Sequence, residues 1–322
     1  MTMTSLAKPT SAPSCSEWAL SQQLDPAGTA GNYKGFLLVE QPLPWPADAS
    51  SVPELAGVSE LASSAGLRLQ LLSSESRPGR SDDGGLRVIC YRQAQEGWAG
   101  DLVRSECIAP AGQVAAAVSD MVSSGAAGAP SPGAASSQDG GAVVDVLVCT
   151  HGQRDTCCGS KGTRLFAELT ESPLGAAQLP VRLWRTSHTG GHRFAPSAIA
   201  FPSGTMWAYS DSALLRAVVG AGAGEAGTAP GHYRGCATLG TPRAQALESA
   251  VFAKVGWSVL RDARRALEAP GGRLRLETLG NGTWEGVVRE GRRVPQPDCR
   301  TDPGAATKHG VEWVVEDLCR LG

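Results

Sequence analysis

Residues 143–169 read VVDVLVCTHGQRDTCCGSKGTRLFAEL, and residues 179–195 read LPVRLWRTSHTGGHRFA. Together they place three of the nine cysteines and three of the five histidines within 44 positions. Thiolates and imidazoles are good ligands for zinc and iron, and neighbouring glycines let the backbone approach a bound group closely. The stretch therefore predicts a metal or iron–sulfur site. Its candidate ligands are Cys149, His151, Cys157, Cys158, His188 and His192.

The residues around these candidates predict an α/β arrangement. Residues 143–148 are a β-rich run that leads directly into Cys149, residues 162–169 have helical spacing, and residues 181–186 favour a second strand. Strand, helix and strand are compatible with a thioredoxin-like unit. In that layout Cys149 lies at the carboxyl end of a strand, where α/β proteins commonly bind ligands.

The chain before this unit divides into three parts. Residues 1–31 are mostly small and polar and predict a disordered lead-in. Residues 32–122 predict an N-terminal α/β lobe, with strands near 35–41, 67–72 and 86–92 and helices that start near Pro53 and Val114. Residues 123–141 contain no large apolar side chain and predict a flexible linker.

The ligand-bearing domain is predicted over residues 142–240, and a C-terminal region follows over 241–322. In the C-terminal region, Thr241 and Pro242 favour a helix start, and apolar spacing predicts that the helix continues to the Pro270 turn. The sequence Gly280-Asn281-Gly282 between two apolar runs then predicts a β-hairpin.

Composition excludes several classes of protein. With 29 basic and 31 acidic residues the formal net charge is −2, which predicts no binding to nucleic acid or to an acidic membrane surface. The sequence contains no run of 18 apolar residues, so it predicts no membrane span. Its N-terminus lacks the apolar core of a secretory signal peptide, and we therefore expect a cytoplasmic protein. Nine scattered cysteines are an odd number and do not resemble a secreted disulfide framework.

Two thiolates and two imidazoles would suit either a structural zinc ion or a [2Fe–2S] cluster with mixed ligands. Spacing disfavours the Rieske type, because no second closely spaced Cys–His pair follows Cys149 and His151. A zinc finger and a C-x-x-C motif are disfavoured too. Cys157 and Cys158 are adjacent, and on an extended loop they would point in opposite directions, so only one is expected to be a ligand. A thiol-based reductase that uses this pair is a further alternative.

The pattern C-x8-C followed by H-x-G-G-H, with Arg-Asp inside the first loop, resembles the sucrase/ferredoxin-like family, related to the fungal Apd1-type proteins. LLVEQPLPWP near the N-terminus, HYRGC at 232–236 and VPQPDC at 294–299 extend the resemblance over most of the chain. It implies a thioredoxin-like [2Fe–2S] ferredoxin domain, accompanied here by the N-terminal lobe and by the C-terminal helix and hairpin. No paired carboxylates support the glycosidase activity that the word sucrase suggests.

The resemblance implies that Cys149, Cys158, His188 and His192 bind the two irons, and its spacing selects Cys158 over Cys157. It implies an electron carrier, rather than a stand-alone enzyme, that works with a redox partner protein. Imidazole ligands raise a cluster's reduction potential, and a ligated imidazole can lose its second proton, so we expect proton-coupled electron transfer. The expected neighbours of the cluster are Arg154, Asp155, Gly190, Gly191, Cys157 and His151.

Overall fold

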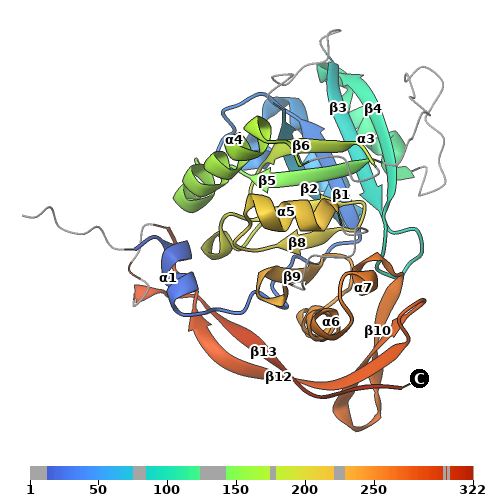
Figure 1. Cartoon of the computed structure of the whole chain (residues 1–322). Helices are drawn as coiled ribbons and strands as arrows, with labels where there is room; N and C mark the ends of the chain where they lie inside the picture. The colour runs from blue at the N-terminus through green and yellow to red at the C-terminus, as the bar shows by residue number, and fades with distance from the viewer. Residues whose placement is uncertain are drawn as a thin grey trace, which may run out of the picture.

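The computed structural model describes residues 13–74, 85–123, 143–174, 179–220, 229–299, 302 and 305–321. It shows a mixed α/β fold built on two sheets (Figure 1). The larger has nine strands in the order β4-β3-β1-β2-β6-β5-β7-β8-β9, and the smaller has four in the order β10-β11-β12-β13. Within the ranges just given, no helix is both long and apolar enough to cross a membrane.

The nine-stranded sheet contains the same strand pattern twice. In each half the first two strands are parallel, the third pairs antiparallel with the first, and the fourth pairs antiparallel with the third. The first half-sheet comprises β1 (Gly35–Glu40), β2 (Leu67–Ser73), β3 (Gly85–Arg92) and β4 (Val103–Pro110). The second half-sheet comprises β5 (Val144–Cys149), β6 (Val181–Thr186), β7 (Ala198–Phe201) and β8 (Thr205–Trp207), with β9 (Tyr233–Cys236) paired to β8.

The two half-sheets meet at a narrow seam. Strands β2 and β6 pair antiparallel through only two residue pairs, Leu72 with Thr186 and Ser73 with Arg185. The sheet bends so that its inner faces pack together, with Phe36 of β1 5.0 Å and Tyr91 of β3 4.2 Å from Phe201 of β7, measured between ring centroids. The half-sheets therefore share a central core that contains residues of both.

Helices cover the outer face of each half-sheet. The outer face of the first packs on α2 (Val58–Ser64) and α3 (Val114–Ser123). The second packs on α4 (Thr163–Glu171), α5 (Ser212–Val219) and α6 (Pro242–Val255). The predicted lobe of 32–122 and domain of 142–240 each contain one half-sheet, joined through the seam. The predicted linker, apart from Ser123 at the end of α3, lies outside the described residues.

The C-terminal region differs from the single long helix predicted up to Pro270. Helix α6 ends at Val255 because Gly256 has a φ of 87°, and a short helix, α7 (Ser258–Arg261), leads into a strand. The predicted hairpin is present and forms part of a larger, four-stranded sheet. Its strands are β10 (Arg264–Ala269), β11 (Arg273–Thr278), β12 (Thr283–Pro295) and β13 (His309–Arg320), and the last two form the long curved ribbon below α6 in Figure 1.

The predicted disordered lead-in is wrong over its described part, which contains α1 (Cys15–Ser21). Ser14 starts this helix with a capping box, because its Oγ accepts from the Glu17 N–H at 3.3 Å and its own N–H donates to the Glu17 carboxylate at 3.0 Å. Ala19 is buried with Phe194 and other apolar side chains, so contacts from elsewhere in the chain order this segment. Residues 1–12 lie outside the described residues.

Candidate metal centre

Cys149 is the last residue of β5, as the sequence predicted, and its side chain is fully buried. The N–H of Cys149 donates to the Ser197 carbonyl at 3.0 Å, and the N–H of Thr150 donates to the Thr186 carbonyl at 3.1 Å. Strand β5 is therefore held on both sides up to the point where the chain turns away. Its sulfur is presented from a rigid strand end.

Cys158 opens a short π-helical turn, η4 (Cys158–Gly162), which leads into α4. This turn lies directly against the end of β5. A Cβ atom on Gly162 would lie 1.9 Å from the Cys149 carbonyl oxygen, and one on Gly159 would lie 2.4 Å from the Gly152 Cα. The glycines of CCGSKG are thus required by the close approach that brings Cys158 to Cys149.

His188 follows β6 and completes a group with the two cysteines. One ligand atom from each of Cys149, Cys158 and His188 lies within 4.8 Å of the others, and we call these three residues the first group. The His188 carbonyl accepts from Arg68 at 3.1 Å and from Gln70 at 3.2 Å, both on β2. The first half-sheet thus holds the backbone of a candidate ligand that belongs to the second.

His151 is buried and uses both ring nitrogens in hydrogen bonds. Its Nδ1 accepts from the His188 N–H at 3.2 Å, so its Nε2 carries the proton and donates to the Pro46 carbonyl at 2.8 Å. The ring also meets Trp45 edge to face, with 5.9 Å between ring centroids. His151 therefore links the loop after β1 to the backbone of His188 and is not itself placed as a ligand.

His192 lies apart from the first group. Gly190 and Gly191, with φ of 80° and 67°, turn the chain from His188 into η5 (His192–Phe194), which agrees with the turn predicted from the paired glycines. Nδ1 of His192 lies 3.1 Å from the Cys15 sulfur and 3.3 Å from the Cys299 sulfur. The four proposed cluster ligands are thus divided, three in the first group and His192 beside other thiols.

Cys157 and Cys158 are consecutive residues of a helical turn, not of an extended loop. Because successive side chains on a helix point about 100° apart, the two thiols face different neighbours. Cys158 belongs to the first group, whereas the Cys157 sulfur lies 3.1 Å from that of Cys15. We call Cys15, Cys157, Cys299 and His192 the second group.

The first group favours negative charge on sulfur. A hydrogen bond from Cys158 holds the pKa of Cys149 well below its usual range against the opposing effect of burial, and His188 lowers it further. Burial would lower the pKa of His188, but Asp155 and Cys149 raise it above its ordinary value. The surroundings of this group therefore favour a deprotonated Cys149 sulfur beside a protonated His188 ring.

Asp155 lies between the two candidate histidine ligands. Its carboxylate oxygens lie 2.9 Å from Nδ1 of His188 and 3.7 Å from Nδ1 of His192. Despite burial, these imidazoles hold the pKa of Asp155 below its usual range, so the carboxylate stays charged. A carboxylate in this position can orient metal-binding imidazoles. Arg154, its neighbour, instead donates to the Ala47 carbonyl at 3.4 Å.

Arg234 of β9 supplies a buried positive charge near the first group. It donates to Gly190 O at 3.0 Å and to Thr29 Oγ1 at 3.1 Å, and no carboxylate among the described residues pairs with it. Burial lowers its pKa to about 10, while the thiols of Cys149 and Cys158 act in the opposite direction. The guanidinium stays charged at neutral pH and can balance thiolates. Sequence reasoning noted HYRGC only as part of the resemblance and did not single out Arg234.

The first group fits a metal or a small cluster. Its donors are two buried sulfurs and an imidazole, a set suited to zinc and to iron. Nδ1 of His188 is buried 2.9 Å from the Asp155 carboxylate, which can orient the ring while its other nitrogen binds a metal.

Comparisons with known proteins agree with the motif. The model of the sucrase/ferredoxin-like family matches residues 26–235, which cover both half-sheets and all of the first group. No curated protein and no solved structure matches the chain.

Proposed function

The chain belongs to the sucrase/ferredoxin-like family, and from this premise we propose that it is an electron carrier with a [2Fe–2S] cluster. The proposed ligands are the thiolates of Cys149 and Cys158 and the imidazoles of His188 and His192. The observation that carries the proposal is the first group itself, in which two buried sulfurs lie beside a partly exposed imidazole near the carboxyl ends of β5 and β6. We further propose that the second half-sheet is a thioredoxin-like unit, which its strand order supports.

A [2Fe–2S] cluster accepts and releases one electron, at a potential that rises when imidazoles replace thiolates. The residues of this chain divide the tasks around it. Cys149 and Cys158 are almost fully buried, whereas the side chains of His188 and His192 are 18% and 16% exposed. The histidine side is therefore the edge through which an electron would exchange with a redox partner protein. Arg234 offsets negative charge on the sulfurs from the buried side.

A cavity of about 450 Å³ adjoins this histidine edge. It is lined by the first half-sheet and by the loops of the second, including Arg68, His151, Arg154 and His188. The cavity lies between β2 and the loop after β5, and His188 of the histidine edge lines part of it. It gives a small acidic segment of a partner protein a place to contact the histidine edge.

The test compares the wild type with Cys158→Ser and Cys157→Ser after purification under nitrogen. We expect the wild type to be reddish-brown, to contain iron and sulfide in equal amounts, and to give a [2Fe–2S] EPR signal when reduced. Cys158→Ser should lose the iron and the colour, because a cluster ligand is removed. Cys157→Ser should keep both, because Cys157 faces the second group.

A colourless protein with zinc in the first group would contradict the electron-transfer proposal and favour a structural role. Loss of iron in Cys157→Ser together with its retention in Cys158→Ser would reverse the assignment of the ligand.

A further inference from the structure

Three cysteines that are far apart in the sequence lie together beside the first group. Cys15 opens α1, Cys157 immediately precedes η4, and Cys299 follows β12. The Cys15 sulfur lies 3.1 Å from that of Cys157 and 3.2 Å from that of Cys299. Nothing in the local spacing of the sequence links these residues, since 142 positions separate Cys15 from Cys157 and 284 separate it from Cys299.

An imidazole completes this second group. Nδ1 of His192 contacts Cys15 at 3.1 Å and Cys299 at 3.3 Å. Three sulfurs and one nitrogen make the Cys₃His donor set of a structural zinc site. Cys15 and Cys157 are almost fully buried, and Cys299 and His192 are partly buried, so the donors face each other and not solvent.

Four of the six donor separations are close to those of a tetrahedral metal site. Four ligands at zinc bond lengths are separated by about 3.8 Å between two sulfurs and about 3.5 Å between sulfur and nitrogen. The four observed separations of 3.1–3.3 Å are slightly shorter. Cys15, Cys299 and His192 offer ligand atoms within 4.8 Å of one another, and Cys157 joins these three residues through its contact with Cys15. The observed separations are much longer than a disulfide bond of about 2.05 Å, and the cysteines are free thiols.

We propose that Cys15, Cys157, Cys299 and Nδ1 of His192 form a structural zinc site, distinct from the first group. Adjacent Cys157 and Cys158 then serve two different centres, one on each side of the helical turn. His192 would then bind zinc through Nδ1 and the cluster proposed above through its other ring nitrogen, which requires the ring to lose its remaining proton and bridge the two centres as an imidazolate. The zinc site depends on the second group alone and stands whether or not the first group binds iron.

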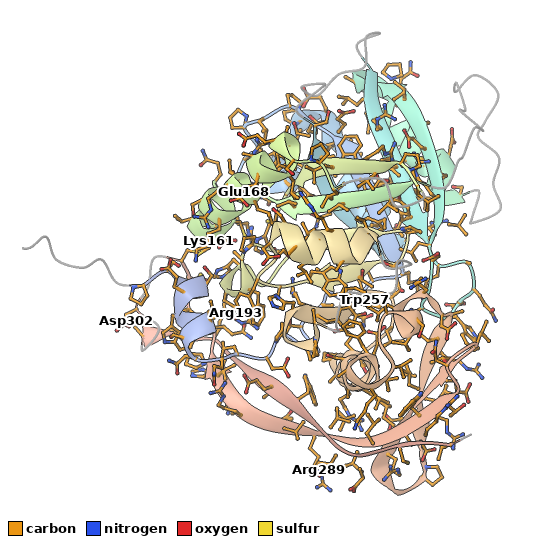
Figure 2. All side chains as sticks on the ribbon, in the orientation of Figure 1. Lys161, Glu168, Arg193, Trp257, Arg289 and Asp302 are labelled. Atoms are coloured by element: carbon orange, nitrogen blue, oxygen red, sulfur yellow. The ribbon has the colours of Figure 1, made fainter. Side chains whose placement is uncertain are left out.

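This site would tie both ends of the chain to the ligand-bearing loop. Cys15 anchors α1, and Cys299 anchors the segment after β12, at the side of the molecule where α1 lies near the end of that strand (Figure 1). Lys161 of η4 and Arg193 of η5 also lie around α1 (Figure 2), and Lys161 pairs with Glu17 of α1 at 3.3 Å. A cross-link that closes such long loops restricts the unfolded chain strongly.

The test measures zinc and iron per chain by plasma mass spectrometry in full-length protein grown with both metals. We expect about one zinc ion per wild-type chain. Cys299→Ser and Cys15→Ser should reduce zinc about tenfold or more, with iron unchanged. Cys319→Ser is the matched control, because Cys319 is exposed on β13 and should keep its zinc. Cys149→Ser should show the reverse pattern, with iron lost and zinc kept.

X-ray absorption at the zinc edge of the wild type tests the site without any variant. Three sulfurs at about 2.3 Å and one nitrogen at about 2.0–2.1 Å are expected. Absence of zinc, its retention in Cys299→Ser, two sulfurs with two nitrogens, or a disulfide among the three cysteines would each overturn the proposal. Iron missing from an otherwise zinc-loaded wild type would instead contradict only the electron-carrier proposal.

Discussion

The two half-sheets have the same strand order and the same strand directions, yet they do different work. In the second half-sheet, the loop after β5 is Thr150–Cys158, which contains Cys157 and Cys158. In the first half-sheet, the corresponding loop after β1 is Gln41–Ala47, which contains three prolines and Trp45. The second half therefore supplies the proposed ligands. The first half supplies hydrogen-bond partners that hold those ligands in place. The Pro46 carbonyl bonds to His151, which accepts from the His188 N–H, and Arg68 and Gln70 donate to the His188 carbonyl. The same topology serves as a site in one copy and as its support in the other.

The largest effect is expected from a substitution at Gly162, in the turn of the second half-sheet that packs against the end of β5. Gly162→Ala would place a Cβ 1.9 Å from the Cys149 carbonyl, while the φ of −66° is ordinary for alanine, so the conflict is purely steric. We expect the free energy of unfolding to fall by about 3 kcal/mol and iron binding to be lost. Urea denaturation and iron analysis measure both.

The matched control is Gly112→Ala in the first half-sheet, where an added Cβ meets nothing within 4 Å. It should leave stability and iron content unchanged. Equal stability of the two variants would show that the turn does not need its close approach to β5.

A smaller effect is expected when the link between the half-sheets is cut at His151. His151→Phe keeps an aromatic ring beside Trp45 but leaves the Pro46 carbonyl and the His188 N–H without their partner. Two buried groups without hydrogen bonds should lower the free energy of unfolding by roughly 2 kcal/mol. Iron should be retained, because both ring nitrogens of His151 bond to backbone groups and His151 does not belong to the first group.

His309→Phe is the control, since His309 is exposed on β13, and its effect should stay within about 0.5 kcal/mol. If His151→Phe lost its iron while its stability matched that of the wild type, His151 would be a ligand and the comparison between the halves would fail.

The smallest effect is expected at Arg68, one of two donors to the His188 carbonyl. Arg68→Met keeps the apolar stem, and Gln70 still donates to the same oxygen, so the free energy of unfolding should fall by about 1 kcal/mol or less. Loss of a positive charge beside the site should also lower the reduction potential. Denaturation and redox titration test the two effects.

Arg164→Met on α4 is the control, because Arg164 is exposed and pairs only with Glu168 one turn away, at 3.7 Å. A potential that moved equally in both variants would mean that Arg68 acts by general charge, not by its place at the site.

Local patterns predicted the elements nearest the first group. Strands β5 and β6, helix α4 and the turn at Gly190 and Gly191 all follow from hydrophobic spacing and glycine chemistry. These features depend on residues close together in the sequence. They predicted Cys149 at the carboxyl end of a strand, and the second predicted strand ends two residues before His188.

Non-local contacts account for what the sequence left out. Cys15 and Cys299 lie far from the motif, so no spacing rule could bring them to Cys157. The predicted helix up to Pro270 was wrong for a local reason, because residues 264–269 form a hairpin with β11 across the turn at 270–272, and this pairing overrides their helical spacing. Strand β13 was missed because it is ordered mainly by β12.

The position of Cys15 and Cys299 near opposite ends of the chain sets an order of events during synthesis. At about 5–20 residues per second, roughly 15–60 seconds pass between the synthesis of these two residues. During that interval Cys15, and from its own synthesis Cys157, are thiols whose third sulfur does not yet exist. The nascent chain therefore cannot complete the second group until β12 has been made, and a ribosome that stalls before residue 299 releases a product with unprotected thiols.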